Sequence, residues 1–404
     1  MSTYDFALIG AGIAGASLAA ELSLGGARVL LLEAEVRPGY HATGRSAAFW
    51  EECYGGPDIV PLTLASGEYL RSGGFLQQRG ALYIARDEDA ALVGDFLERF
   101  QATGAVLERL GAAEVQRRVP GIRPAWSAAV WEPACADIDV AALHAHYLRQ
   151  ALDTGVNLQC RARVTGLQRI SGCWRITDVR GEEYHADCVV NAAGAWADGL
   201  AAMAGARQAG ITPYRRTVAQ LRLGTNVPEN LPLVLDIEGK FYFKPEAGRL
   251  WLSPHDEEPS EPCDAAPEEA AIAHAIDRFA HVLGWKVEAV ERKWAGLRSF
   301  VHDHLPVVGF DPDVEGFFWL AGQGGYGVQT APALSRLTAD LVAGTAPQLA
   351  DVPRQLITYE RADGVQLSGT LYLPAGYDKD RDGPLPLIMW AYPAEFTDAS
   401  VAGQ

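Results

Sequence analysis

Hydrophobic and polar positions along the chain alternate between short apolar runs and amphipathic stretches, as in an α/β protein. Apolar runs at residues 6–9 and 28–32 have the length of buried strands, and a stretch of small and apolar residues between them predicts a helix. Runs at residues 187–191 and 316–321 are each followed by glycines and a helical pattern. This pattern predicts a mixed α/β fold with a Rossmann-like domain of parallel strands.

A second type of pattern occupies residues 211–252. Aromatic and aliphatic residues alternate there in several short runs that proline and glycine interrupt. Such runs predict strands of an antiparallel sheet. An acidic, proline-rich loop at residues 254–267 and a helix at residues 267–283 follow it.

The loop after the first strand carries the spacing Gly10-x-Gly12-x-x-Gly15. Gly10 allows a tight turn, Gly12 allows the backbone to approach a pyrophosphate, and Gly15 allows the helix to pack on the strand. Glu33 ends the second strand, where a carboxylate accepts hydrogen bonds from a ribose hydroxyl. Glycine-rich loops without a ligand also show this spacing. The full order of strand, glycines, helix, strand and acid favours an adenine dinucleotide without a 2′-phosphate.

Two further glycine-rich turns suggest which dinucleotide binds. The strand at 187–191 leads into Ala-Ala-Gly194, and the strand at 316–321 leads into a glycine cluster at a helix start. Two anion-binding turns with one dinucleotide point to a flavin rather than NAD. Gly44 and the small residues after it also predict a helix start close to a ligand, or a helix packed tightly on the first one.

Length and charge limit the function classes. A chain of 404 residues suits two or three domains, and a net charge of −17 argues against nucleic acid as a partner. We find no signal peptide and no apolar run of about 18 residues. We therefore expect a cytoplasmic protein with at most peripheral contact with the inner membrane.

Cysteine and histidine positions do not predict a metal site. The six cysteines are scattered without a C-x-x-C pair, so we expect reduced thiols. His144 and His146 point to different sides of the helix predicted at 140–154, and we expect both at the surface.

Six motifs in this order resemble a known family: GAGIAGAS, GYHATGRSAA, NAAGAWADGLA, KFYFKPEAG, WAGLRSF and GFFWLAGQGGYGVQT. From about Tyr4 to Gly344 the chain resembles the glycine oxidase and D-amino-acid oxidase superfamily of FAD enzymes, and within it bacterial FAD-dependent D-amino-acid dehydrogenases of the D-arginine dehydrogenase type. The resemblance implies a FAD domain of the glutathione-reductase type and a substrate domain with a mixed sheet. It implies hydride transfer from the substrate Cα to flavin N5, then hydrolysis of the imino acid to a 2-oxo acid and ammonia.

The resemblance also implies domain boundaries. Residues 1–80, 136–210 and 290–350 would form the FAD-binding domain, and residues 81–135 and 211–289 the substrate-binding domain. FAD is expected to be noncovalent, because no cysteine follows Trp294 where sarcosine-oxidase-like relatives attach their flavin.

The site residues follow from matching positions. Arg298 matches the arginine that pairs with the substrate carboxylate, and Arg216 resembles its helper. Tyr54 and Tyr242 match tyrosines that bind the amino acid and close the pocket. Gly325 and Gln329 match positions beside the substrate amine and the flavin. The cofactor site is implied to contain Gly10, Gly12, Ile13, Ala14, Gly15, Glu33, Ala34, Gly44, Arg45, Ser46, Ala47, Ala48, Val164, Ala193, Gly194, Trp196, Gly324, Gly325, Tyr326, Gly327, Val328 and Gln329.

Two departures from the pattern concern the substrate side chain. Phe49 stands where the D-arginine-preferring members have a histidine, and Ala81 stands where they have a glutamate that holds the guanidinium. Glu51 or Glu52 could substitute, but a solvated helix face is the more ordinary place for them. We therefore expect neutral or apolar D-amino acids as substrates.

Alternatives remain open at this point. The same fold could serve an amino-acid oxidase, a 2-hydroxy-acid dehydrogenase or a catalytically silent flavin-binding protein. The electron acceptor could be a quinone, another carrier or O₂. The partner we expect is a small amino-acid substrate.

The pattern of hydrophobic and polar residues changes at residues 351–404. Asp363-Gly364 between alternating runs predicts a hairpin, and Leu385 to Tyr392 predicts a buried strand. This tail resembles the opening strands of the hydrolase domain of prolyl-oligopeptidase-type peptidases. It has no G-x-S-x-G elbow, so we expect no peptidase activity. A fusion scar, a designed chimera and a docked cap are all compatible with it.

Overall fold

The computed structural model describes residues 3–47, 49–342, 344, 354–360 and 366–372. It divides into one unit of residues 1–342 and a second of residues 343–404. In the second unit, β21 (Arg354–Glu360) and β22 (Gln366–Tyr372) pair antiparallel, which confirms the predicted hairpin strands. The Asp363-Gly364 turn and the strand predicted at 385–392 lie outside the described residues.

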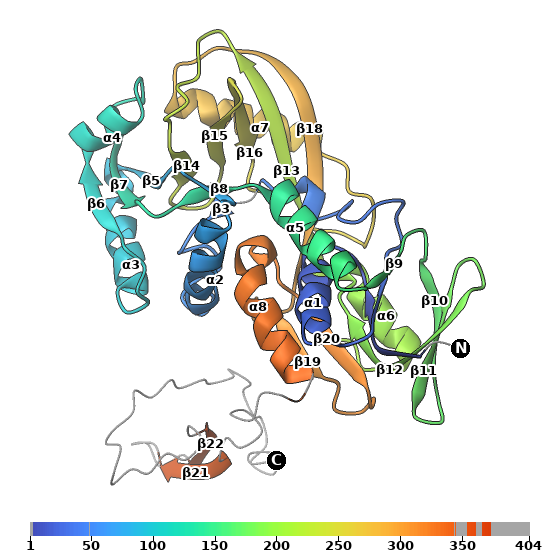
Figure 1. Ribbon diagram of the computed structural model, residues 1–404. Helices are drawn as coiled ribbons and strands as arrows, with labels where there is room; N and C mark the ends of the chain where they lie inside the picture. Colours follow the sequence, from blue (N-terminus) through green and yellow to red (C-terminus); the bar gives the residue numbers. More distant parts are fainter. Residues whose placement is uncertain (1–2, 48, 343, 345–353, 361–365, 373–404) are drawn as a thin grey trace. The chain divides into compact units, whose positions relative to one another are not determined.

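The first sheet of the larger unit contains the predicted parallel strands (Figure 1). Its parallel part runs in the order β9 (Asn157–Gln159), β2 (Val29–Leu32), β1 (Thr3–Ile9), β12 (Glu183–Asn191) and β20 (Phe317–Ala321). Ile9 is in register with both Leu32 and Asn191, so the carboxyl ends of the three central strands coincide. This alignment brings the turns that follow these strands to one edge. Antiparallel neighbours are β10 (Val164–Ile170), β11 (Cys173–Asp178) and β19 (Val307–Phe310).

Alternating side chains of this sheet enter two different cores. Leu8 and Leu31 face one core together with helices α1 (Ile13–Leu24), α5 (Val140–Asp153) and α8 (Gly327–Val342). Ala7 and Leu30 face the other core, which α6 (Ala197–Ala204) covers. Both faces are therefore buried, which explains why these strands read as continuous apolar runs.

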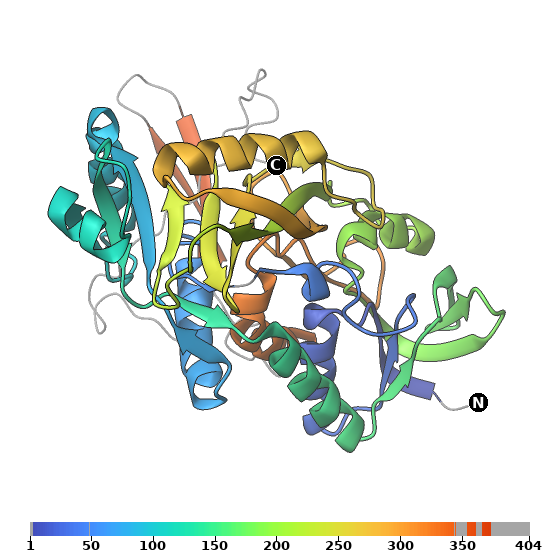
Figure 2. The same ribbon diagram turned by 90° about the horizontal axis from the view of Figure 1, so that it is seen from above.

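The second sheet contains the predicted strand-rich region. β13 (Thr212–Leu223) pairs antiparallel with β18 (Val287–Phe300), β16 (Arg249–Ser253) and β17 (Glu258–Pro259), and β16 pairs with β15 (Tyr242–Glu246). β14 (Leu233–Asp236) joins β15 to β5 (Ala81–Arg86), and β7 (Trp126–Glu132) and β6 (Glu108–Gly111) complete the sheet. Helix α7 (Glu269–Val282) packs over it (Figure 2). The mixed α/β fold is thereby confirmed.

A small third sheet contains β3 (Phe49–Trp50), β8 (Ala136–Ile138) and β4 (Leu76–Gln78), and helix α2 (Val60–Ser72) lies between β3 and β4 in the chain. Helices α3 (Ala90–Phe100) and α4 (Ala112–Arg118) link strands β5, β6 and β7 of the second sheet. The helix predicted after Gly44 is wrong. Residues Thr43–Arg45 form a single 3₁₀ turn, and Ser46 is already extended (φ −71°, ψ 137°), so the chain leaves the turn as strand β3. Within the described residues, no helix combines the length and apolar character needed to cross a bilayer.

Candidate functional site

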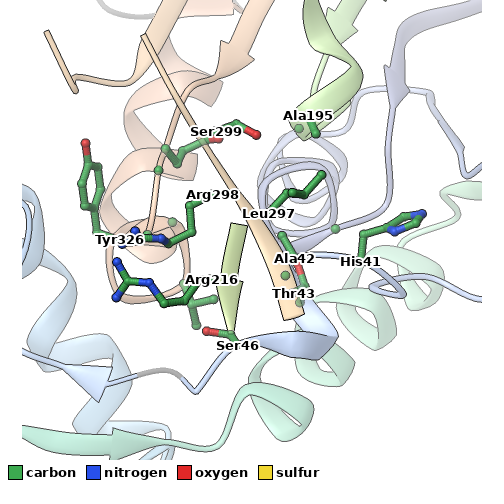
Figure 3. A pocket seen from close by; sticks show the side chains of 18 of the residues that line it. His41, Ala42, Thr43, Ser46, Ala195, Arg216, Leu297, Arg298, Ser299 and Tyr326 are labelled. Carbon is green, nitrogen blue, oxygen red and sulfur yellow. The ribbon is translucent and has the colours of Figure 1, made fainter. Parts of the chain in front are cut away.

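A cavity of about 1010 Å³ lies in the larger unit. Its walls come from the turns after the parallel strands and from residues of the second sheet, and Figure 3 shows part of them. Segments that are hundreds of residues apart in the sequence therefore line one cavity.

The glycine loop forms one wall with its backbone. Gly10 has φ +106°, and an added Cβ there would overlap the carbonyl of Ala192. An added Cβ at Gly12 would lie 3.2 Å from Thr43 Oγ1, which accepts a hydrogen bond from Ile13 N at 3.0 Å. Gly10 and Gly12 both line the cavity at the start of α1, where a pyrophosphate fits because the helix dipole favours an anion.

Glu33 stabilises this loop as well as lining the cavity. Its Oε2 accepts a hydrogen bond from Ala11 N at 3.0 Å, and its Oε1 accepts one from Glu35 N at 2.9 Å. A carboxylate oxygen accepts more than one hydrogen bond, so Glu33 retains capacity for a ribose hydroxyl.

The predicted surface position of His144 is wrong. It is buried rather than at the surface, and its Nε2 lies 2.9 Å from the carbonyl oxygen of Ala11 in the glycine loop. Burial lowers the pKa of His144, so its neutral form is favoured. His146 is exposed, as predicted, and contacts Tyr69. The contact to Ala11 spans 133 residues, and no local pattern in the sequence indicates it.

Almost all residues predicted for the cofactor line this cavity. Gly15 and Gly44 do not. An added Cβ at Gly15 would overlap the Gly10 carbonyl, and one at Gly44 would meet the Gly39 carbonyl at 2.5 Å, so both glycines serve close backbone packing. Ala48 lies outside the described residues. The prediction missed Thr43 and Ala42, which line the cavity from the 3₁₀ turn.

Arg45 joins the cavity wall to the second sheet. Its Nη1 donates to the carbonyl oxygens of Ala265 at 3.0 Å and Ala295 at 3.1 Å, and it forms an ion pair with Asp264. In return, Trp294 Nε1 donates to the Arg45 carbonyl at 3.0 Å. These contacts fix the loop before α7 against the cofactor side of the cavity.

Arg298 and Arg216 lie side by side on β18 and β13 (Figure 3). Each is only 9% exposed. Burial, followed by the charge of Arg298, lowers the pKa of Arg216 to about 10. Burial also acts to lower the pKa of Arg298, but Tyr54 and Glu257 outweigh it and the net shift is upward. Both guanidinium groups remain charged at neutral pH, so the cavity wall attracts an anion.

Tyr54 and Gly325 meet next to this pair. Arg298 Nη1 donates to the Tyr54 hydroxyl at 2.8 Å, and an added Cβ at Gly325 would overlap the same hydroxyl. Gly324 N donates to the Ser299 carbonyl at 2.9 Å, which ties the glycine cluster to β18. Tyr242 lies on the cavity wall with its ring 5.8 Å from that of Phe49. Burial raises the pKa of Tyr242, which keeps its hydroxyl protonated as a donor.

Gln329 holds the loop that carries Glu51. Its Nε2 donates to the Glu51 carbonyl at 3.1 Å and to Thr63 Oγ1 at 2.8 Å, while its Oε1 accepts from Glu51 N at 3.3 Å. The side-chain amide is therefore used within the protein, and Gln329 reaches the cavity as a brace of this loop.

A buried acidic cluster is the feature that sequence reasoning missed. Glu51 and Glu52 are 4% and 5% exposed, so their predicted place on a solvated helix face is wrong. Tyr83 donates a hydrogen bond to Glu51, and Glu132 accepts one from Glu52 N at 2.7 Å. Burial raises the pKa of Glu51 to about 7 and also raises that of Glu132. Glu51 and Tyr83 line the cavity.

The family model for FAD-dependent oxidoreductases, DAO, matches residues 5–341. Glycine oxidase from Geobacillus kaustophilus is 25% identical over 84% of this chain and 93% of its own. Its crystal structure superposes with a TM-score of 0.74 over 85% of this chain and 95% of that chain. The FAD-bound L-α-glycerophosphate oxidase of Mycoplasma pneumoniae shares the fold at 18% identity, with a TM-score of 0.76 and coverage of 85% and 95%.

A short match concerns a different kind of protein. A probable chloroplastic glutamyl endopeptidase of Arabidopsis thaliana is 57% identical over 58 residues. These residues make up 14% of this chain, and the chain spans only 6% of the length of that peptidase.

Proposed function

The chain belongs to the DAO family of FAD-dependent oxidoreductases, and we propose that it oxidises D-amino acids to imino acids, which water hydrolyses to 2-oxo acids and ammonia. Bound FAD supplies the oxidant that removes two electrons from the substrate amine. The observation that carries the proposal is the pair of buried arginines, Arg298 and Arg216, in one cavity wall. A planar, permanently charged guanidinium suits the carboxylate of an amino acid because it donates two parallel hydrogen bonds.

Two tyrosines complete the amino-acid site. The Tyr54 hydroxyl accepts a hydrogen bond from Arg298 and can donate its own proton to the substrate carboxylate. Tyr242 is protonated and buried in the same wall. A substrate amine that binds in its neutral form needs no strong base from the protein, so these residues act by positioning.

The lining of the cavity supports a neutral or apolar substrate side chain. Phe49, Phe96, Phe100 and Leu235 contribute to it. Glu51 and Asp236 also line the cavity, and burial raises the pKa of both carboxyl groups, that of Glu51 to about 7, so Glu51 is largely protonated below neutral pH.

The test is anaerobic mixing of the FAD-loaded protein with D- and L-amino acids while the flavin absorbance is followed. We expect D-methionine and D-phenylalanine to bleach the flavin, D-arginine to do so much more slowly, and the L-enantiomers to leave the spectrum unchanged. Bleaching by none of these compounds, or D-arginine far ahead of D-methionine, would contradict the proposal.

Variants of the arginine pair link the reaction to the site. Arg298→Lys keeps the charge but loses the fork, and we expect KM to rise about 10- to 100-fold. Arg222→Ala is the matched control, because Arg222 lies on the same strand as Arg216 but is exposed and pairs with Glu288 and Glu291. If Arg298→Lys retains FAD and its KM is unchanged, the assignment of Arg298 to the substrate carboxylate is wrong.

The similarity to glycine oxidase favours an oxidase as the second candidate. Oxygen consumption during turnover distinguishes it from a dehydrogenase that uses a quinone or another carrier. Ammonia release separates amino acids from 2-hydroxy acids as substrates.

We infer further that residues 351–404 derive from a hydrolase of the glutamyl endopeptidase type. The short match to the plant enzyme supports this origin. A variant that ends after Gly344 tests its role, and we expect that variant to retain FAD and the turnover of the full chain.

A further inference from the structure

Glu257 places a carboxylate of the protein itself on the arginine pair. Its Oε1 accepts a hydrogen bond from Arg298 Nη2 at 2.5 Å and another from Arg216 Nη2 at 3.3 Å. Charge-assisted bonds of this kind are the ones that a substrate carboxylate would make. Glu257 lines the same cavity, in the loop before α7.

Both Nη atoms of Arg298 already donate hydrogen bonds within the protein. Nη1 is used by the Tyr54 hydroxyl and Nη2 by Glu257, while Nε is buried without a partner within the described residues. A carboxylate that binds bidentately needs two neighbouring N–H groups of the guanidinium. Each Nη carries two N–H groups, but a carboxylate placed between Arg298 and Arg216 would meet the Glu257 oxygen that the Nη2 atoms of both arginines contact, so the two carboxylates compete for this position.

The residues on either side of Glu257 are held by hydrogen bonds of their own. Asp256 accepts hydrogen bonds from Thr217 N at 2.7 Å and Thr217 Oγ1 at 2.8 Å, and its carbonyl accepts one from Arg216 Nε at 3.0 Å. Residues Glu258–Pro259 pair with β13 as β17. The Glu257 side chain, in contrast, is 52% exposed. Rotation of this side chain frees the arginines without any movement of the strands, and such rotations are fast.

The electrostatics explain why a carboxylate occupies this place when no substrate is bound. Two buried guanidinium groups side by side repel one another, and a nearby anion relieves this repulsion. Glu257 supplies that charge. An incoming carboxylate supplies the same charge, so the two anions are alternatives for one position.

We propose that Glu257 sets the affinity of this enzyme for its substrate by occupying the carboxylate site between turnovers, so that every substrate binds by displacing it. The proposal rests on the assignment of Arg298 and Arg216 as the carboxylate site under the proposed function. As a consequence, the apparent association constant for any carboxylate equals the intrinsic association constant multiplied by the fraction of molecules in which Glu257 has left the arginine pair. Glu257 thereby acts as a specificity-determining residue. When its side chain leaves the arginine pair, a negative charge is lost, and a neutral ligand cannot replace that charge.

The experiment compares Glu257→Gln with Glu258→Gln in the FAD-loaded protein. Both substitutions remove one negative charge, from adjacent positions, but Glu258 lies in β17 and makes no ion pair with Arg298 or Arg216 among the described residues. The probe is benzoate, a carboxylate without an amine, and its Kd is measured from the change in the flavin spectrum. We expect Kd to fall about threefold or more in Glu257→Gln, because a half-exposed ion pair no longer competes with benzoate, and to stay at the wild-type value in Glu258→Gln.

Kinetics and a second variant complete the test. With an amino acid that the enzyme oxidises as the substrate, KM should fall by the same factor in Glu257→Gln, while kcat stays within about twofold of the wild-type value. Glu257→Asp, with a shorter reach, should lie between Glu257→Gln and wild type. A Kd for benzoate that rises or stays unchanged in Glu257→Gln overturns the proposal, because Glu257 then supports the arginines instead of competing for them. A lower Kd without turnover of any amino acid supports the role of Glu257 and refutes the proposed function.

Discussion

Replacement of Glu51 by glutamine tests the buried acidic cluster through the pH dependence of stability. Glu51 is buried, and burial raises its pKa from an ordinary 4.5 to about 7. A carboxyl whose pKa is higher in the folded protein than in the unfolded chain stabilises the fold while it is protonated. This contribution is complete below pH 4.5 and is lost as the pH rises through about 7.

The size of the effect follows from the shift. A difference between 4.5 and about 7 corresponds to about 3 kcal/mol of stability lost between pH 5 and pH 8. The amide introduced by Glu51→Gln keeps an acceptor for the Tyr83 hydroxyl and carries no charge at any pH. For a unit of this size, about 3 kcal/mol corresponds to about 4 °C in Tm.

The assay is thermal unfolding of the protein with saturating FAD at pH 5 and pH 8. We expect Glu51→Gln to unfold within about 1 °C of wild type at pH 5 and about 4 °C above it at pH 8. Glu68→Gln, at an exposed position of α2, is the control for the lost charge and should follow the wild type at both pH values. A Tm that drops between pH 5 and pH 8 by the same amount in Glu51→Gln as in wild type would refute the reasoning.

Three further predictions concern single positions. Gly10→Ala should lose FAD on gel filtration, because the added Cβ overlaps the Ala192 carbonyl and φ is +106°; retained yellow colour would contradict this. Gly325→Ala should keep FAD but raise KM about tenfold, since the methyl group displaces the Tyr54 hydroxyl from Arg298; an unchanged KM would argue against that contact. Cys263 is the one exposed cysteine of the six, so a thiol reagent should label one group rapidly in the native protein and none in Cys263→Ser.

Local patterns predicted the elements whose spacing is set within a few turns of chain. The order β1, glycine loop, α1 and β2 is such a case, since a strand, a tight turn and a helix each leave their own period. The antiparallel strands β13, β15 and β16 were also predicted, because alternation and interrupting prolines and glycines are local signals.

Contacts between distant segments account for what the sequence could not reveal. Glu51 and Glu52 follow strand β3 in the chain, and adjacent glutamates are usually solvated. In the structure, Glu132 on β7 accepts a hydrogen bond from Glu52 N across 80 residues of sequence, and Gln329 on α8 contacts the Glu51 backbone across 278. His144 is similar, because its partner Ala11 lies on another element. The occupation of Arg298 by Glu257 likewise depends on how the loop before α7 pairs with β13.

The strand order of the first sheet determines when the protein can acquire its cofactor during synthesis. β1 and α1 leave the ribosome first, but β12 gains its neighbour β20 only after residue 321, and α8 packs on α1 only after it is complete at Val342. The nascent chain must therefore keep its first strands in a partly assembled state until nearly the whole unit has been translated. The residues that line the cavity extend from Ile9 to Gln329, so the complete FAD site can form only after nearly the whole unit has been translated.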